Sequence, residues 1–254
     1  MQSSPAALRV ALFSGNYNYV KDGANQALNR LVGRIEARGG QARVYSPVSR
    51  TPAFAPTGTL IGVPSLPIPG RGEYRVALGL PPAAMRDLAR FRPTVVHLSA
   101  PDWLGHAAKS WAKRQHLPVV ASVHTRFETY FDYYRMGFIR RGVERRLKAF
   151  YRDLAEIYAP SESMADVLRS GGYSERVRIW SRGVDRQLFM PEARDMGWRR
   201  ALGIADAMPV IGFVGRLVLE KGLDIVAAVG AELKARGVAH RFVIVGEGPA
   251  RDWI

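Results

Sequence analysis

The chain has 254 residues, of which 47% are apolar and 23% charged, as in a soluble globular protein with one large domain or two smaller ones. It contains no cysteine, which excludes disulfides, thiolate zinc sites and a cysteine nucleophile. Its 37 Lys and Arg residues against 22 Asp and Glu give a formal net charge of +15. This excess indicates an anionic partner, unless it reflects only a genome that favours Arg.

The sequence carries no recognisable targeting or membrane-spanning segment. The start of the chain, residues 1–5, is polar and lacks the basic and apolar regions of a signal peptide. No segment reaches the ~18 consecutive apolar residues that span a bilayer. We therefore expect a cytoplasmic protein, with peripheral attachment to the inner face of the cell membrane as the second possibility.

The first part of the chain alternates strands with helices. Residues 8–13 form a short apolar run before Ser14 and Gly15, which predicts a buried strand. Residues 23–37 have helical spacing and end at Gly39-Gly40, a helix stop. Further strands are expected at 42–45, 94–98, 118–123, 157–159 and 177–180, and further helices at 81–90, 104–115, 138–158 and 162–170. This order predicts a parallel sheet covered by helices on both faces.

The segment 47–69 is rich in Pro and Gly, and we interpret it as a loop with an edge strand at 60–63. A second α/β unit begins after it in the chain, and we place the domain boundary between residues 190 and 191. In this second unit we expect helices at 197–202 and 223–236 and strands at 209–214 and 241–245. A doubly wound domain needs about 100 residues or more, so we expect the domain 191–254 to be incomplete.

The segment 138–158 combines an apolar stripe with a strongly basic opposite face. Ile139, Val143 and Leu147 begin the stripe, and six Arg or Lys residues occupy the other face. The ordinary interpretation is a core helix with a solvated cationic side. The alternative is docking on anionic lipid, where each cation contributes about 1 kcal/mol.

Residues 213–224 (FVGRLVLEKGLD) carry the sharpest chemical pattern. An apolar strand ends at Gly215, the cations Arg216 and Lys221 follow, and a helix begins after Gly222. Glycine lets a ligand approach the backbone, a helix start favours an anion, and Arg supplies paired donors, which together suit a diphosphate. An ordinary strand-turn-helix with solvated cations has the same spacing, so the pattern by itself leaves both interpretations open.

The ordered set of motifs resembles the retaining glycosyltransferases of family 4, which have the GT-B fold of two Rossmann-like, doubly wound α/β domains. The resemblance covers nearly the whole chain and is nearest to the subgroup of sulfolipid synthases and lipid-directed α-mannosyl-, glucosyl- and glucuronosyltransferases. It rests on 213–224 with 243–254 (VIVGEGPARDWI), on 182–185 (RGVD) with 189–191, on 123–127 (VHTRF) with Tyr130 and Tyr134, and on 93–97 with 101–105 (PDWLG).

The resemblance implies a role for each motif. Arg216 and Lys221 would hold the donor diphosphate and stabilise the charge on the leaving nucleotide. His124 would lie in the cleft against the donor, and Asp22, Arg126 and Tyr130 would lie on the acceptor side. The remaining donor-binding residues would be Gly23, Gly215, Gly246, Glu247 and Gly248. Members of the family generally need no metal for the reaction, and we expect no metal and no cofactor here.

The implied function is transfer of a hexose from a nucleotide-diphosphate sugar to a lipid or glycan hydroxyl, with an anionic membrane surface as a further partner. The family's acidic E-x7-E motif would fall beyond residue 254, so the alternative is a truncated, non-catalytic chain that binds nucleotide sugar or membrane without turnover. A nucleic-acid partner is disfavoured, because the sequence has no helix-turn-helix, zinc or aromatic-platform pattern.

Overall fold

The computed structural model describes residues 8–68, 71–124, 137–218 and 221–254. The chain divides into two compact units, unit 1 (Met1–Arg182) and unit 2 (Gly183–Ile254). This boundary precedes the one expected after residue 190, and the residues between, 183–190, are all exposed. The predicted α/β class is confirmed, and each unit is described by itself below.

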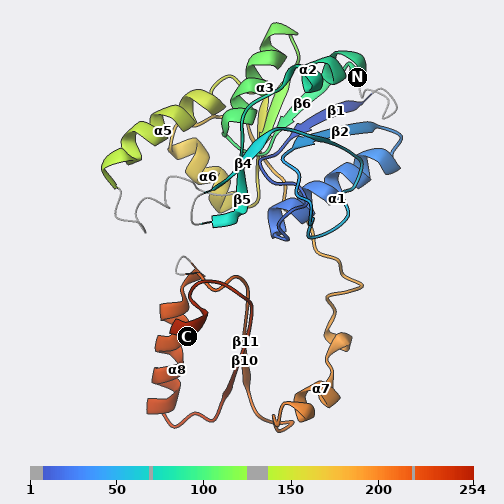
Figure 1. Cartoon of the computed structure of the whole chain (residues 1–254). Helices are drawn as coiled ribbons and strands as arrows, with labels where there is room; N and C mark the ends of the chain where they lie inside the picture. Colours follow the sequence, from blue (N-terminus) through green and yellow to red (C-terminus); the bar gives the residue numbers. More distant parts are fainter. Residues whose placement is uncertain (1–7, 69–70, 125–136, 219–220) are drawn as a thin grey trace. The chain divides into compact units, whose positions relative to one another are not determined.

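Unit 1 is built on a seven-stranded sheet in the order β3-β2-β1-β6-β7-β8-β9, with every neighbouring pair parallel (Figure 1). Parallel pairing requires a crossover between strands, which agrees with the alternation of apolar runs and helical spacing in the sequence. The strands are β1 (Arg9–Phe13), β2 (Gln41–Ser46), β3 (Thr59–Gly62), β6 (Val95–Leu98), β7 (Val119–Ser122), β8 (Glu156–Ala159) and β9 (Val177–Ile179).

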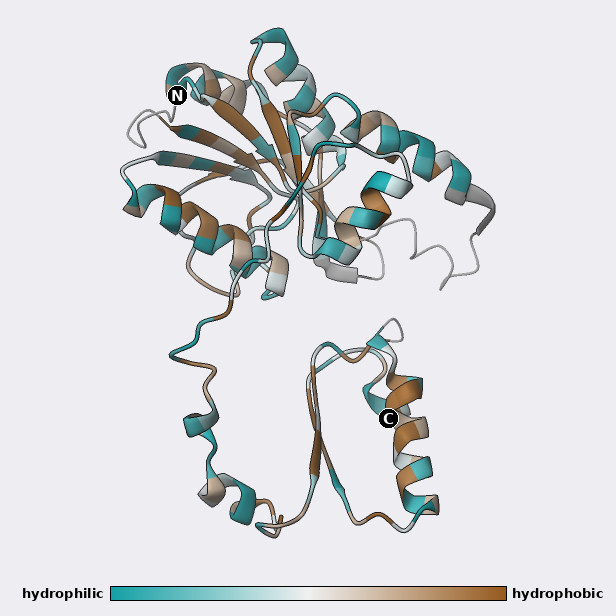
Figure 2. Cartoon of the chain, turned by 180° about the vertical axis from the view of Figure 1, so that it is seen from behind, coloured by the Kyte–Doolittle hydropathy of each residue, from teal (hydrophilic) through white to brown (hydrophobic). Residues whose placement is uncertain are grey.

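Two hydrophobic clusters cover the two faces of this sheet. In β1, Ala11 and Phe13 belong to the larger cluster, whereas Val10 and Leu12 belong to the smaller one, because successive side chains of a strand point to opposite faces. Helix α1 (Gly23–Ala37) packs in the smaller cluster. The larger cluster contains residues of α2 (Pro82–Phe91), α3 (Trp103–Arg114), α5 (Gly137–Tyr151) and α6 (Glu162–Ser170). Figure 2 shows these apolar strands between helices that alternate hydrophobic and hydrophilic sides.

The segment 47–69, which was predicted as a loop with one edge strand, contains a second strand. The edge strand is present as β3, but the chain then forms a two-stranded antiparallel sheet from β4 (Ser65–Ile68) and β5 (Arg71–Ala77). Pro67 lies within β4 beside a register shift, which is where a strand tolerates a residue without an amide hydrogen. The proline that indicated a loop is therefore accommodated at an irregular pairing.

The helix expected at 138–158 ends at Tyr151, so its predicted C-terminal part is wrong. Leu154 and Ile157 continue the helical spacing, but the amide of Ala155 donates to Val119 O at 2.8 Å and Ile157 pairs with Ala121 in the sheet. Both side chains are buried, but Leu154 lies in the turn after α5 and Ile157 lies in β8. A short apolar run does not distinguish the 3.6-residue period of a helix from the two-residue period of a strand.

Unit 2 is smaller and more open. Its parallel pair consists of β10 (Val210–Val214) and β11 (Arg241–Val245), joined through α8 (Leu223–Ala235). A short helix, α7 (Met196–Ala201), precedes them, and two single-turn 3-10 helices span Pro191–Ala193 and Arg251–Trp253. The buried cluster of this unit comprises Leu217, Leu223 and Ala250.

Candidate functional site

The order of strands creates a crevice in unit 1 at the carboxyl end of β1. This strand lies between β2 and β6, and the chain leaves it in the direction of β2 but later returns to β6 on its other side. Open α/β sheets bind ligands at such a reversal, because the two connections diverge there. The loops that follow β1, β6 and β7 would each contribute side chains to a ligand at this edge.

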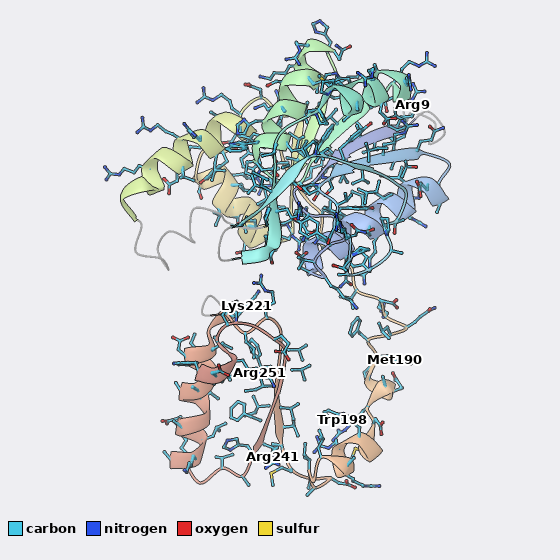
Figure 3. The ribbon with its side chains drawn as sticks, in the orientation of Figure 1. Arg9, Met190, Trp198, Lys221, Arg241 and Arg251 are labelled. Carbon is cyan, nitrogen blue, oxygen red and sulfur yellow. The ribbon has the colours of Figure 1, made fainter. Side chains whose placement is uncertain are left out.

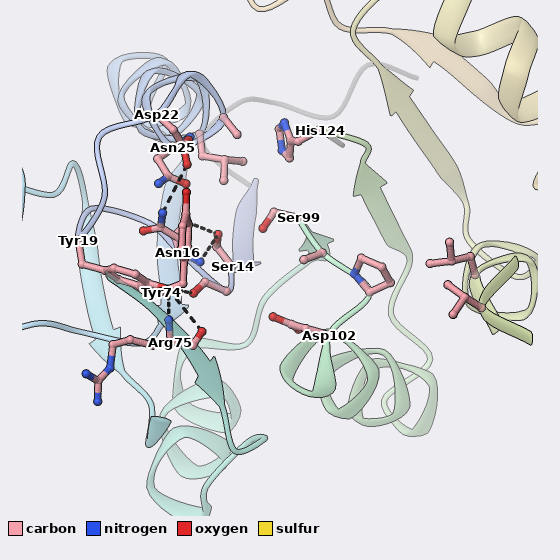
Figure 4. A pocket seen from close by; sticks show the side chains of 17 residues that line it. Ser14, Asn16, Tyr19, Asp22, Asn25, Tyr74, Arg75, Ser99, Asp102 and His124 are labelled. Atoms are coloured by element: carbon pink, nitrogen blue, oxygen red, sulfur yellow. Dashed lines mark hydrogen bonds between the residues drawn. The ribbon is translucent and has the colours of Figure 1, made fainter. Parts of the chain in front are cut away.

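A cavity of about 460 Å³ occupies this place, and Figure 4 shows its polar side chains coming from separate loops. The loop after β1, the start of α1 and the loop after β6 supply most of its polar groups, whereas α5 supplies the apolar Val143 and Leu147. The labelled polar or aromatic residues are Ser14, Asn16, Tyr19, Asp22, Asn25, Tyr74, Arg75, Ser99, Asp102 and His124.

Hydrogen bonds within the β1–α1 loop fix one wall of the cavity. The Tyr19 hydroxyl donates to Gly15 O at 2.6 Å, and the Ser14 hydroxyl donates to Asn16 O at 2.5 Å. Asp22 Oδ1 accepts the backbone amide of Asn25 at 2.8 Å and so caps α1. The loop is thus held in one shape before any ligand arrives.

The loop after β6 is fixed in a similar way by Asp102. Its Oδ1 accepts the amide of Gly105 at 2.7 Å and caps α3, and burial raises the pKa of this carboxyl group. Gly105 is required because a Cβ there would lie 2.2 Å from Ala100 O. A Cβ on Gly15 would similarly lie 2.7 Å from Asp102 Oδ2, so the two loops are in direct contact. These contacts explain the Pro-Asp-x-x-Gly pattern at 101–105.

His124 follows the end of β7 and is largely enclosed. Its Nε2 is 2.8 Å from the Ser122 hydroxyl, and its Nδ1 is buried with no hydrogen-bond partner among the described residues. Burial, with smaller effects from Arg182 and His97, lowers its pKa to about 3. At neutral pH the ring is therefore uncharged and can offer one donor or acceptor, but no positive charge, to a ligand.

Arg182 acts electrostatically on this histidine, and its own backbone is strained. Its φ of 67° is rare for a residue other than glycine, and its Nη2 donates to Val123 O at 3.5 Å. Asp22 raises the pKa of Arg182 and burial lowers it, the latter effect being larger. Residues in this conformation cluster at functional sites.

The residues expected in unit 1 separate into three groups. Asp22 and His124 line the cavity, and Gly23 opens α1 with free space where a Cβ would stand. Arg126 and Tyr130 lie outside the described residues. Sequence reasoning missed Ser14, Asn16, Tyr19 and Arg75, although a polar residue directly after an apolar strand, as at Ser14, was an available signal.

In unit 2 the glycine-containing loop 246–248 packs against the turn that follows β10. Gly215 N donates to Val245 O at 3.0 Å, and Leu217 N donates to Glu247 O at 2.9 Å. A Cβ on Gly246 would lie 1.8 Å from Gly215 O, and one on Gly248 would lie 2.2 Å from Leu217 O. The close approach of these two turns therefore explains why glycine occupies both positions. The Glu247 carboxylate is exposed and pairs with Arg251 at 3.0 Å.

The expected diphosphate anchors lie where β10 leads into α8. Lys221 is exposed at this end of the unit, away from Arg241 at the start of β11 (Figure 3). Gly222, the N-cap residue of α8, has φ 70° and no side chain with which to cap the helix. The amides at a helix N-terminus, next to a lysine, favour an anion. Arg216, in the turn after β10, is half-buried.

No group of three or more His, Cys, Asp or Glu residues in the described part of the chain has the arrangement of a metal site. Likewise, no helix in the ranges that the structure describes is long and apolar enough to cross a membrane.

The model of glycosyltransferase family 4 matches residues 21–188, which include the start of α1, the cavity loops after β6 and β7, and the segment through Arg182. The chain belongs to glycosyltransferase family 4. This confirms the resemblance drawn from the sequence motifs.

Curated relatives in the family align with almost all of this chain. They include a GDP-mannose-dependent alpha-mannosyltransferase of Mycobacterium tuberculosis, 31% identical over 95% of this chain and 63% of the relative. The corresponding enzyme of Corynebacterium glutamicum is 26% identical over 97% and 59%, and a sulfoquinovosyl transferase of Arabidopsis thaliana is 26% identical over 96% and 48%. The chain thus spans about half to nearly two thirds of the length of these family 4 relatives.

Solved structures show the same fold at low identity. Sucrose-phosphate synthase from Thermosynechococcus elongatus superposes with a TM-score of 0.66 at 15% identity, covering 94% of this chain and 70% of that one. The glycosyltransferase WaaG of lipopolysaccharide biosynthesis gives 0.57 at 19% identity, covering 96% and 65%. The fold of this family 4 chain is therefore that of the GT-B glycosyltransferases.

Proposed function

We propose that this chain provides the acceptor-side domain and the first part of the donor-binding domain of a retaining glycosyltransferase. The reaction moves a hexose from a nucleoside-diphosphate sugar to a hydroxyl group of a lipid or glycan. Membership of glycosyltransferase family 4 supports the reaction class. The relatives support the substrates, because three of them are GDP-mannose-dependent alpha-mannosyltransferases and two others are alpha-monoglucosyldiacylglycerol synthases.

The observation that carries the proposal in unit 1 is the cavity at the strand reversal with His124 at its wall. A carbohydrate needs many short polar contacts, and the fixed loops supply hydroxyl, amide and carboxylate groups at this place. The apolar Val143 and Leu147 complete the lining, which suits the apolar face of a sugar ring or a lipid next to its head group. Asp22, Arg126 and Tyr130 are assigned to the acceptor.

In unit 2, Arg216 and Lys221 are assigned to the donor diphosphate. Breaking the bond from the sugar C1 to the phosphate oxygen leaves negative charge on the nucleoside diphosphate. Cations and helix amides that are already in place stabilise such charge without reorganising. Gly215 and Gly222 carry no side chain at the two ends of the segment between β10 and α8, so that a phosphate can approach the backbone there.

We further propose that unit 1 attaches peripherally to the inner face of the cell membrane through α5. Arg141, Arg145 and Arg146 on this helix are exposed, whereas Leu147 and Phe150 are buried in the core. The basic side is therefore available to anionic head groups while the apolar side is occupied.

Donor binding is tested by calorimetry with GDP-mannose and UDP-glucose, followed by turnover assays with the same donors. Arg216→Ala and Lys221→Ala are each expected to weaken binding at least tenfold, because each removes a charge-assisted hydrogen bond. Arg236→Ala, at the opposite end of α8, serves as the matched control and should bind like wild type. Equal binding by all three variants would contradict the diphosphate assignment. Binding of a donor without turnover would support the non-catalytic alternative.

Membrane attachment is tested by sedimentation with phosphatidylglycerol vesicles at low and high salt. Replacing Arg145 and Arg146 by Gln should reduce the bound fraction, and salt should have the same effect, because exposed charges are screened. The control pair is Arg34 in α1 and Arg38 directly after this helix, which are also exposed. Binding that is insensitive both to salt and to the α5 substitutions would refute this mode of attachment.

A further inference from the structure

Two buried polar side chains of unit 1, His97 and Ser122, form a continuous hydrogen-bonded chain with the partly buried His124. The Ser122 hydroxyl lies 2.9 Å from His97 Nε2 and 2.8 Å from His124 Nε2. His97 is 4% exposed and Ser122 is 2% exposed, and both come from central strands, β6 and β7. These hydrogen bonds therefore connect the interior of the sheet with the cavity that His124 lines.

The number of protons in this chain is limited. Burial lowers the pKa of His97 to about 4 and that of His124 to about 3, so both rings are neutral at physiological pH. A neutral imidazole has one N–H and one bare nitrogen, and a serine hydroxyl has one proton to donate. If Ser122 donates to one Nε2, it can be bonded to the other only by accepting a hydrogen from it. One of the two Nε2 atoms must then carry a proton and the other must not.

We propose that His97 and Ser122 are positioning residues that hold the two histidine rings in opposite tautomers, leaving Nδ1 of His124 as the atom that bonds the ligand. The inference rests on the proposed function, because it specifies how His124 acts there. Nε2 of His124 is occupied by Ser122, whereas Nδ1 is buried without a partner among the described residues. A buried polar atom without a partner destabilises the fold, and a hydrogen bond from a ligand would offset this loss.

The indole of Trp180 restrains both rings from the side. It meets His97 edge-on at a centroid distance of 6.3 Å and His124 at 6.0 Å. Its own backbone amide donates to Ala159 O at 2.7 Å, which anchors it to the end of β8. The rings are thus held by packing as well as by the shared hydroxyl.

The coupling has a directional consequence for binding. An oxygen acceptor of a donor sugar or phosphate at Nδ1 of His124 requires the proton on Nδ1 and a bare Nε2. Ser122 then donates to His124, and His97 must donate to Ser122 from its own Nε2. Binding in the cavity therefore fixes the tautomer of a residue that the ligand does not touch.

Nitrogen-15 NMR of selectively labelled histidine tests the coupling directly on the 254-residue chain, which contains five histidines. We expect the Nε2–H populations of His97 and His124 to add up to one, and GDP-mannose to move His97 towards the Nε2–H form. Ser122→Ala should abolish this relation, and Ser122→Thr, which keeps a hydroxyl, should retain it. The exposed His116 serves as an internal control whose signals stay unchanged. Equal tautomers in both rings, or a relation that survives in Ser122→Ala, would overturn the proposal.

A matched pair of substitutions separates the coupling of the two tautomers from the proposed role of His124 in donor binding. The amide of Asn reaches the position of Nδ1, whereas that of Gln extends to that of Nε2. We expect His124→Asn to bind GDP-mannose better than His124→Gln by about tenfold, the equivalent of one hydrogen bond. If both bind as wild type while the tautomers are coupled, the coupling stands but His124 has no role in donor binding. If Gln binds better than Asn, the assignment of Nδ1 is wrong.

Discussion

Units 1 and 2 are both parallel α/β structures, but they differ in how completely their apolar surfaces are covered. In unit 1 the central strands are enclosed on two faces, and Leu12 and Ile157 are 0% exposed. In unit 2 the strand residue Val214 is 80% exposed and the helix residue Ile225 is 65% exposed. A two-stranded sheet with one helix cannot bury both of its faces. The comparison predicts that unit 1 carries most of the folding free energy, whereas unit 2 contributes mainly its loops.

The largest expected effect comes from a matched pair of isoleucines. Ile157→Ala removes a fully buried side chain of β8 and should lower the unfolding free energy of unit 1 by about 2–5 kcal/mol. Ile225→Ala removes an exposed side chain of α8 and should change the stability of unit 2 by less than about 0.5 kcal/mol. Hydrogen exchange in increasing urea reports the two units separately. Equal losses in both would remove the distinction between them.

A pH titration of stability should distinguish the units next. The pKa of His97 falls from 6.5 to about 4 on folding, so below pH 6.5 the unfolded chain takes up a proton that the folded chain does not. Unit 1 should therefore lose stability as the pH falls from 7 to 4, by at most about 3 kcal/mol from this residue.

Urea unfolding at several pH values measures this dependence. His97→Gln should weaken it and leave the part that comes from His124, whose pKa is also lowered, to about 3. His240→Gln in unit 2 should leave it unchanged. An unaltered pH dependence in the His97 variant would show that another group is responsible.

The smallest expected difference between the two units comes from removing one helix-capping aspartate in each. Asp22 caps the 15-residue α1, which packs on the sheet, and Asp195 caps the six-residue α7 by accepting from the Trp198 amide at 3.0 Å. Asp22→Ala should cost about 1 kcal/mol of unit 1 stability, as is typical of lost caps. Asp195→Ala should increase exchange only in α7. Loss of global protection in the Asp195 variant would mean that α7 is part of the stable core.

The sequence predicted elements well where one period extended over a long stretch. Helix α1 has the expected bounds, because its apolar positions recur over 15 residues between a capping Asp22 and the glycines that end it. The end of α5 was wrong because Leu154 and Ile157 satisfy helical spacing while lying in a turn and a strand. The β4–β5 pair was missed because Pro67 indicates a loop, whereas the two strands pair around it with a shift in register.

The candidate site was harder to predict than the fold. Asp22 and His124 were expected near a ligand from the family motifs, and both line the cavity. The partners of His124 could not be predicted, because His97 lies 27 positions earlier in the sequence and Ser122 reads as an ordinary strand residue. Parallel pairing of β6 with β7 brings them together. Similarly, the contact between Gly15 and Asp102 depends on two loops that are neighbours only in space.

Hydrogen exchange with and without GDP-mannose or UDP-glucose tests the proposed donor assignments in both units at once. We expect slower exchange at the start of α1, residues 23–26, and at the start of α8, residues 222–226, with no change at α7. Protection should be lost at α8 in Lys221→Ala. Slower exchange in neither segment with any nucleotide sugar, while the chain remains folded, would contradict the assignment of these loops to the donor.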